Sequence, residues 1–238
     1  MKKSTILCVF AHPDDETFGP GGTIALLAQR HEVWLVSATQ GDAGKDSRKN
    51  RRRSLANERS REFKAAARIL GAKGVLLLNF RDGELSNNTY PALARRIEAI
   101  VRRLKPHTVL TYEPLGVSGH LDHIAVALAT RFIFERQPGI KRLLSYCAPT
   151  KRADAMRPGY FIWVPPGYER STIDMIVPTA GIWGTKRAAM AAHRSQRHDI
   201  ERILARIKRF PKEESFLVQT RPGAPALHLP VRRGRAHA

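Results

Sequence analysis

Short apolar runs bounded by turn residues recur along the chain, and longer segments of helical spacing separate them. Runs of this kind, rich in β-branched and aliphatic residues, are typical of strands buried inside a sheet. The four clearest occupy residues 6–10, 33–38, 75–80 and 108–112, and further strands are expected at 141–147, 160–164 and 173–177. The hydrophobic pattern thus predicts an interior built on buried strands.

Helical patterns lie between these strands. Residues 23–30 follow a glycine-rich turn, residues 51–70 are rich in alanine and arginine, and residues 186–210 return to helical spacing. In residues 91–104 the apolar positions fall on one face, as in a helix packed against a sheet. This alternation predicts a parallel sheet with right-handed crossovers. The expected fold class is α/β, a Rossmann-like three-layer α/β/α sandwich with a mostly parallel sheet, and residues 149–159 are expected to form a loop near the site.

The length of 238 residues and the hydrophobic fraction of 42% are ordinary for one globular α/β domain. We expect that domain to span residues 1–221. Residues 222–238 are rich in proline, glycine and arginine, so they are expected to form an irregular or disordered basic tail.

The formal net charge of +20 is the unusual feature of the composition. Positive charge is concentrated in residues 48–53, in residues 186–212 and in the tail at Arg232, Arg233 and Arg235. Such blocks can bind an anionic substrate or surface, including the phosphates of nucleic acid, lipid or a sugar. They can also be solvated faces. The second interpretation is favoured because the basic residues are spread along the chain without interleaved aromatic residues.

Cys8 and Cys147 are the two cysteines, far apart and each inside an apolar run. They are expected to be buried free thiols in a reducing compartment, because no disulfide framework or CxxC site is available. No run approaches the roughly 18 apolar residues of a membrane-spanning helix. The first apolar run leads into charged residues instead of a cleavage site, so no signal peptide is expected. The expected location is cytoplasmic.

Candidate chemistry begins directly after the first predicted strand, in the sequence Ala-His-Pro-Asp-Asp-Glu at residues 11–16. The carboxyl ends of strands are where α/β sheets bind ligands. Negative charge concentrated there needs a cation or raised pKa values. His12 and Asp15 are three apart around a tight turn and can converge, while Asp14 points elsewhere. Imidazole with carboxylate suits zinc or ferrous iron.

A second cluster, Gly-His-Leu-Asp-His at residues 119–123, leads into the apolar, helix-like residues 124–134. His120 and His123 can both face a site at the beginning of that helix. Two histidine clusters, each with neighbouring carboxylates after a predicted strand, favour a metal site over isolated core histidines.

The ordered pair of motifs, His-x-x-Asp followed at a distance by His-x-Asp-His, resembles the PIG-L/LmbE family of zinc-dependent N-deacetylases acting on acetamido sugars. The other matching positions are Thr39-x-Gly41-Asp42-x-Gly44, Arg59, Glu62, Asp174 and His193-Arg194-Ser195-Gln196. This ordered set is more specific than any one of the motifs.

The resemblance implies one Zn²⁺ per chain, held by His12, Asp15 and His123, although the same ligand set also suits Fe²⁺. It implies that the metal activates a water molecule and that Asp14 is the general base. His120 would stabilise the oxyanion and protonate the departing amine, with Asp122 orienting its ring. Some relatives have a tyrosine where this chain has Ser118, so that protonation falls to His120 or another residue.

Four further residues are candidates for binding the substrate: Asp42, Arg59, His193 and Gln196. Each has a plainer interpretation. Arg59 can be a solvated cation of a basic helix, Asp42 can be a turn residue, and the other two can lie on the surface. Glu16 is expected to support the loop or cap its backbone.

The expected function is hydrolysis of the amide that joins an acetyl or similar acyl group to the amine of an N-acylated sugar or glycoconjugate. A related alternative is an amidase acting on a thiol-sugar conjugate or a lipid-linked sugar. A rival from another class is a phosphate- or nucleic-acid-binding protein whose metal is structural. The sequence is compatible with a homo-oligomer.

Overall fold

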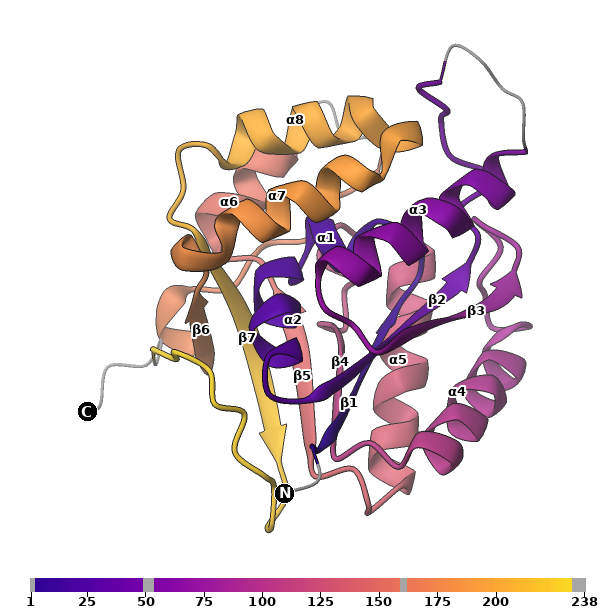
Figure 1. Cartoon of the computed structure of the whole chain (residues 1–238), viewed down its shortest axis with the longest axis vertical. Helices are drawn as coiled ribbons and strands as arrows, with labels where there is room; N and C mark the ends of the chain where they lie inside the picture. Colours follow the sequence, from indigo (N-terminus) through magenta and orange to yellow (C-terminus); the bar gives the residue numbers. More distant parts are fainter. Residues whose placement is uncertain (1–2, 49–53, 159–161, 233–238) are drawn as a thin grey trace.

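The computed structural model describes residues 3–48, 54–158 and 162–232, which form one sheet with helices on both faces (Figure 1). The sheet has seven strands in the order β3-β2-β1-β4-β5-β7-β6. The strands are β1 (Thr5–Phe10), β2 (Glu32–Thr39), β3 (Gly74–Phe80), β4 (Thr108–Tyr112), β5 (Arg142–Cys147), β6 (Met175–Pro178) and β7 (Glu213–Thr220). The first five run parallel, and β7 lies antiparallel between β5 and β6.

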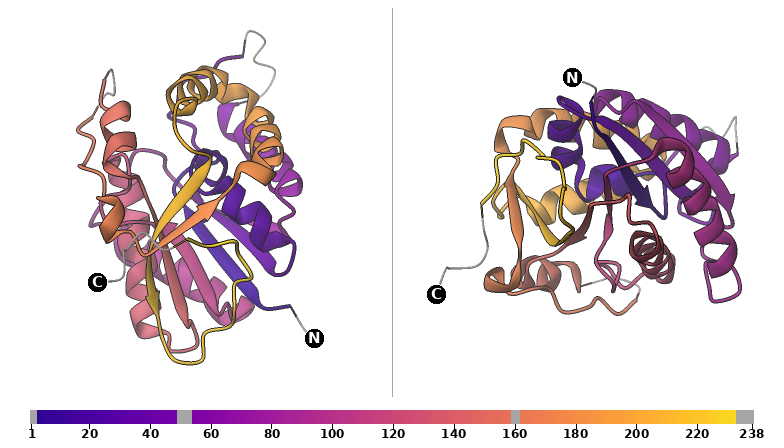
Figure 2. Two further views of the ribbon diagram at one scale, coloured as in Figure 1. Left: turned by 90° about the vertical axis from the view of Figure 1, so that its left-hand side faces the viewer. Right: turned by 90° about the horizontal axis from the view of Figure 1, so that it is seen from below.

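The helices form two layers. They are α1 (Asp15–Phe18), α2 (Gly21–Ala28), α3 (Leu55–Ile69), α4 (Tyr90–Leu104), α5 (Leu121–Arg136), α6 (Thr150–Met156), α7 (Trp183–Ala192) and α8 (Arg197–Ile207). Six of them cover the sheet, with α1, α2, α3 and α7 in one layer and α4 and α5 in the other, and α8 packs on α7 and α6 (Figure 2). This arrangement confirms the expected α/β class and three-layer sandwich.

The order β2-β1-β4 places the ends of β1 and β4 side by side at one edge of the sheet. The two strands are fully buried apart from Thr5, because both faces of the sheet are covered. Their apolar residues, such as Leu7 and Leu110, pack in the central core. The loops after these two strands carry the two histidine motifs, so the topology brings residues about 110 positions apart to one place.

Most predicted strands are confirmed to within one or two residues, and β7 was missed. β7 begins with the polar residues Glu213, Glu214 and Ser215, so its apolar centre is too short to stand out as a strand in the hydrophobic pattern. The strand predicted at 160–164 is not found in residues 162–164, and residues 160 and 161 lie outside the described part of the chain.

Two other predictions from the pattern were wrong. The loop expected at 149–159 contains α6. The helix expected over 186–210 is interrupted at His193, whose backbone leaves the helical region with φ −84° and ψ 64°, and a 3-10 turn at residues 194–196 precedes α8. The polar side chains at this break form hydrogen bonds with α1, with α3 and with the loop after β2. These contacts stabilise the break in place of a continuous helix.

Residues 222–232 have little regular structure, but they pack against the rest of the domain. Arg142 Nη1 donates to the carbonyl of Pro225 at 2.8 Å, His31 Nε2 lies 3.0 Å from the carbonyl of Leu227, and Ile176 forms an isolated bridge with Arg232. Arg233 and Arg235, expected in a basic tail, lie outside the described residues. In the described ranges, no helix is both long and apolar enough to cross a bilayer.

Candidate metal centre

The first motif forms a buried turn at the carboxyl end of β1. His12, Asp14, Asp15 and Glu16 are each at most 8% exposed. Asp14 has φ +121°, an uncommon backbone conformation for any residue except glycine. The carbonyl of Asp14 accepts from the N–H groups of Thr17 and Phe18 as α1 begins. This turn separates the carboxylate of Asp14 from that of Asp15, although the two residues are adjacent.

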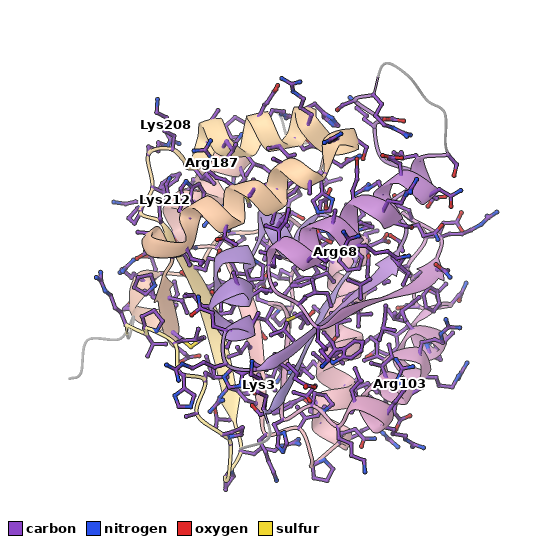
Figure 3. The ribbon with its side chains drawn as sticks, viewed as in Figure 1. Lys3, Arg68, Arg103, Arg187, Lys208 and Lys212 are labelled. Atoms are coloured by element: carbon purple, nitrogen blue, oxygen red, sulfur yellow. The ribbon has the colours of Figure 1, made fainter. Side chains whose placement is uncertain are left out.

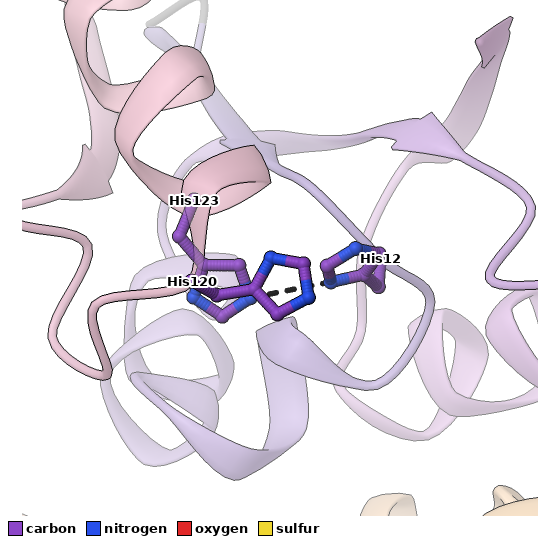
Figure 4. A group of neighbouring side chains, drawn as sticks. All are labelled: His12, His120 and His123. Carbon is purple, nitrogen blue, oxygen red and sulfur yellow. Dashed lines mark hydrogen bonds between the residues drawn. The ribbon is translucent and has the colours of Figure 1, made fainter. Parts of the chain in front are cut away.

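Three candidate ligand residues converge between the two motifs. His12 Nδ1 lies 3.2 Å from His123 Nε2 and 3.5 Å from Asp15 Oδ2, and His123 Nε2 lies 3.4 Å from Asp15 Oδ1. The ring of His120 is close by (Figure 4). One ring nitrogen from each of His12, His120 and His123 lies within 4.8 Å of the other two. Two imidazoles and one carboxylate on a common point are a donor set that fits Zn²⁺ or Fe²⁺.

The protonation of these groups follows from burial and from their mutual charges. Burial lowers the pKa of His123 to about 4, so its ring is neutral, the form that ligates a metal. Burial acts to raise the pKa of Asp15, but His123 and His12 outweigh it and hold the pKa well below its usual value. His12 has a raised pKa despite burial, because it hydrogen-bonds to Asp122 and two other carboxylates. Metal binding would therefore release a proton from His12.

The ring of His12 is oriented from behind by two carboxylates. His12 Nε2 lies 2.9 Å from Asp82 Oδ1 and 3.1 Å from Asp122 Oδ2. Asp122 also accepts from the backbone N–H groups of Gly83 and Leu85, at 2.8 and 3.0 Å. We expected the carboxylate of Asp122 to orient His120, and the structure places it on His12 instead. Such outer carboxylates commonly set the tautomer and orientation of a ligating histidine.

His123 is oriented by the loop that precedes α5. Its ring stacks on Tyr112, with centroids 4.4 Å apart and planes 4° from parallel, and Nδ1 lies 3.1 Å from the carbonyl of Gly116. A Cβ at Gly116, where φ is +69°, would come within 2.7 Å of the His123 Cβ. The absence of a side chain at Gly116 therefore lets the ring reach its position with Nε2 directed at Asp15.

His120 is the N-cap residue of α5, and its Nδ1 accepts a hydrogen bond from the backbone N–H of Asp122 at 3.2 Å. Burial, followed by the charge of His12, lowers the pKa of His120. A neutral ring that accepts at Nδ1 carries its proton on Nε2. His120 can therefore donate a hydrogen bond from Nε2.

Asp14 is held by Arg59, which reaches in from α3. Arg59 Nη2 donates to Asp14 Oδ2 at 2.8 Å and to the carbonyl of Pro13 at 2.5 Å, and Nη1 donates to the carbonyl of Gly41 at 2.6 Å. Arg59 is only 4% exposed, so it is not a solvated cation. Burial raises the pKa of Asp14 to about 7 even though Arg59 opposes the shift.

His193 was a candidate for binding the substrate, and the structure places it behind the first motif. Its Nε2 lies 2.7 Å from Glu16 Oε1, and neither side chain is exposed. Glu16 Oε2 in turn accepts from the backbone N–H of Asp14 at 3.0 Å. Glu16 therefore supports the loop, as expected, and His193 acts through it.

Gln196 is also buried away from the convergent ligands. Its Nε2 donates to the carbonyl of Lys45 at 3.0 Å. Its neighbour Ser195 donates to Glu62 of α3 through both N–H and hydroxyl, at 2.8 and 2.5 Å. The late motif therefore fastens the turn after α7 to α3 and to the loop after β2.

Asp42 lies on the exposed turn after β2, and no hydrogen bond of its side chain is found among the described residues. The residue that sequence reasoning missed is Asp82, whose Oδ2 accepts from the N–H of Ala43 at 2.9 Å. Asp82 follows β3 by two positions, so its placement after a predicted strand was the available signal. Asp82 faces both His12 and the loop that carries Asp42.

Comparison with known proteins gives concordant findings. The family profile described as PIG-L, GlcNAc-PI de-N-acetylase, matches residues 7–134, which include both histidine motifs. The probable N-acetyl-alpha-D-glucosaminyl L-malate deacetylase 2 of Bacillus cereus is 32% identical over 197 residues, covering 80% of this chain and 83% of that protein. The 1D-myo-inositol 2-acetamido-2-deoxy-alpha-D-glucopyranoside deacetylase of Mycobacteroides abscessus is 27% identical over 231 residues, covering 82% of each.

The fold is also similar to a solved structure of N,N'-diacetylchitobiose deacetylase from Pyrococcus horikoshii. The TM-score is 0.67 at 23% identity, and the alignment covers 91% of this chain and 84% of that one.

Proposed function

This chain belongs to the PIG-L family of de-N-acetylases, and from that premise we propose that it is a zinc-dependent deacetylase of N-acetylglucosamine-containing conjugates. The observation that carries the proposal is the convergence of His12, Asp15 and His123 beside the separate carboxylate of Asp14. The names of both relatives contain an N-acetylated glucosamine unit joined to a further group. The substrate proposed here has the same general form.

The metal would be held by His12, Asp15 and His123, whose nitrogen and oxygen donors suit zinc. When bound, Zn²⁺ supplies a Lewis acid and lowers the pKa of a coordinated water to about 7. Tyr112 and Gly116 hold His123 in place, and Asp82 and Asp122 hold His12. These contacts preorganise the ligands.

Asp14 would take the proton from the attacking water. A general base works best when its pKa lies near the working pH, and burial raises the pKa of Asp14 to about 7 before any cation enters. A bound cation would shift that pKa downward, which favours the ionised, basic form. The two hydrogen bonds of Arg59 Nη2, to Asp14 and to the Pro13 carbonyl, fix the direction of the carboxylate.

His120 would stabilise the negative charge that develops on the amide carbonyl oxygen. Its Nδ1 is occupied by the N–H of Asp122, so Nε2 carries the proton that can be donated. A neutral imidazole does not give up its Nε2 proton to an amine, and Ser118 offers no phenol at the position of the tyrosine in some relatives. The departing amine would therefore take the proton that Asp14 receives from the water. Asp82, beside His12 and the loop after β2, would be a further carboxylate to accept a hydrogen bond from a sugar hydroxyl.

The test measures metal content and acetate release from a panel of N-acetylglucosamine conjugates, in the wild type and two variants. Asp14→Asn should retain zinc and lose at least about a hundredfold in turnover, as expected when a general base is removed. His123→Ala should lose both zinc and activity. Asp199→Asn on α8 is the matched surface control and should behave as the wild type.

Full turnover by Asp14→Asn would contradict the assigned base. Absence of stoichiometric metal in the wild type would contradict the metal centre. If zinc is bound but no conjugate releases acetate, the acetamido-sugar assignment fails, and larger amides of thiol-sugar or lipid-linked conjugates become the next substrates to test.

A further inference from the structure

A cavity lies at the same edge of the sheet as the metal centre, beyond the end of β5, the strand next to β4. This cavity of about 370 Å³ is formed by the beginning of α6, by residues 168–170 and by the turn before β7, with Arg152, Tyr168 and Phe210 among its lining. A smaller hollow adjoins it and shares Arg152 and Phe210. Ligands of open α/β sheets bind at this edge.

Positive charge gathers in the wall between the two hollows. Arg152, Lys186 and Lys212 line the smaller one, and Arg152 also lines the larger. Lys186 pairs with Glu214 at 2.6 Å, and that carboxylate also accepts from the backbone N–H groups of Gly22 and Thr23 in the first turn of α2. Glu214 therefore does not neutralise Arg152 or Lys212.

The other nearby carboxylates are engaged as well. Arg170 pairs with Glu213 at 2.5 Å, and the exposed Glu169 accepts from the hydroxyl of Thr150 at 2.7 Å. Among the described residues, the half-buried side chain of Arg152 has no hydrogen bond or ion pair. Lys212 Nζ donates to the neutral carbonyl of Ile207 at 3.0 Å.

This arrangement places like charges close together. Burial lowers the pKa of Lys212, and the charge of Arg152 lowers it further. Burial also lowers the pKa of Lys186, against the attraction of Glu214, and Arg152 and Lys212 add to the shift. A guanidinium and an ammonium group without a counter-charge are the groups that bind phosphate or carboxylate.

The geometry points to a small-anion site where the two hollows meet, in which Arg152, which lines both hollows, and Lys212, which lines the smaller one, hold a phosphate or carboxylate group. Lys186 connects the site with the metal centre, because its Nζ also donates at 2.5 Å to the carbonyl of Gly19, which directly follows α1. The anion has two sources, an acidic group of the conjugate itself or a separate small anion. The first source rests on the proposed function, and the second does not.

The test titrates inorganic phosphate into the full-length, metal-loaded protein by calorimetry. Arg152→Gln and Lys212→Gln should each weaken binding by at least about tenfold, as expected for the loss of one charge-assisted hydrogen bond. Arg152→Lys should lie between Arg152→Gln and the wild type. Arg187→Gln and Lys208→Gln remove exposed cations from α7 and from the residue after α8, nearby on the surface, and should bind as the wild type does (Figure 3).

Phosphate can also bind a metal ion, so His123→Ala serves as a second control. Binding retained in His123→Ala and lost in Arg152→Gln assigns the phosphate to the cavity. Absence of phosphate binding, or equal affinity in the wild type and Arg152→Gln, overturns the proposal.

Two kinetic measurements distinguish the sources of the anion. If the anion belongs to the substrate, N-acetylglucosamine 1-phosphate should have a lower KM than N-acetylglucosamine, and Arg152→Gln should abolish the difference. If the anion is separate, Arg152→Gln should lose phosphate binding while the ratio of the two KM values stays unchanged. Both results support the site. If neither sugar is deacetylated, the proposed function fails, and the phosphate titration still decides the anion site.

Discussion

Arg59 is the residue on which the protonation of the candidate base depends most directly. Its guanidinium is buried, and it donates both to the carboxylate of Asp14 and to two backbone carbonyls of neighbouring loops. Burial alone would push the pKa of Asp14 higher, and the charge of Arg59 is the largest influence that opposes it. Arg59 therefore directs the carboxylate of Asp14 and limits the rise of its pKa.

Replacing Arg59 with glutamine should raise the pKa of Asp14 relative to its value in the wild type and move the acid limb of the kcat/KM profile to higher pH. A base acts only when deprotonated, so the loss of activity should be greatest at low pH and partly recovered on the alkaline side. Each unit of rise costs about a factor of ten well below the pKa. Arg61→Gln, exposed on the same helix, is the control. An unshifted acid limb in Arg59→Gln would show that Arg59 does not control the pKa of the base.

At the scale of elements, α7 and the turn that follows it support the metal loop without contributing a candidate ligand. His193, at the end of α7, contacts Glu16, which holds the backbone of Asp14. Ser195 fastens the same turn to Glu62 of α3. The sequence pattern suggested one long helix here, because periodicity registers apolar spacing and not the polar contacts that interrupt a helix.

The pairing of His193 with Glu16 should make stability depend on pH. Burial acts to lower the pKa of His193, but Glu16 outweighs it, and the pKa lies above the ordinary value of 6.5. The charged ring therefore stabilises the fold fully below the unfolded pKa, and this contribution is lost as the pH rises through the folded pKa. Urea unfolding should show that the stability advantage of the wild type over His193→Phe shrinks from about pH 6 upward.

The exposed His107 offers a control for that measurement, since His107→Asn should leave the pH dependence of unfolding as in the wild type. A constant difference between the wild type and His193→Phe across the pH range would show that His193 contributes packing and not charge.

At the scale of the whole molecule, a buried ion pair joins parts that are distant in the sequence. Lys186 of α7 bonds to Glu214 of β7 and to the carbonyl of Gly19, and Glu214 accepts from the backbone N–H groups of Gly22 and Thr23. The pair therefore connects the antiparallel end of the sheet with the beginning of α2 and the metal loop. Because both groups are buried, removing one leaves the other charge without compensation.

Lys186→Met should consequently destabilise the protein by about 3–5 kcal/mol in denaturant unfolding, the cost of breaking a buried pair. The double variant Lys186→Met with Glu214→Gln should be less destabilised than the sum of the single variants, because the uncompensated charge is gone. The exposed neighbour Arg187→Met should change the free energy of unfolding by no more than about 0.5 kcal/mol. Strict additivity in the double variant would mean that the pair is not coupled.

Features set by neighbouring residues were open to prediction from the sequence. The buried strands, the α/β class and the two histidine motifs at strand ends depend on short-range periodicity and on residues a few positions apart. The side chains of His12, Asp15 and His123 do converge, since the carboxyl ends of β1 and β4 are adjacent in the sheet. That adjacency follows from the crossover topology that the pattern implied.

What only the tertiary structure decided are the contacts between distant segments. These contacts include Asp82 and Asp122 behind His12, Tyr112 stacked on His123, and His193 behind Glu16. Each joins elements that no short-range sequence pattern connects. The antiparallel strand β7 was hidden for the same reason, because its polar beginning is stabilised by partners elsewhere in the chain. Local propensity determines which elements form, and the buried polar groups find partners only when the elements are packed together.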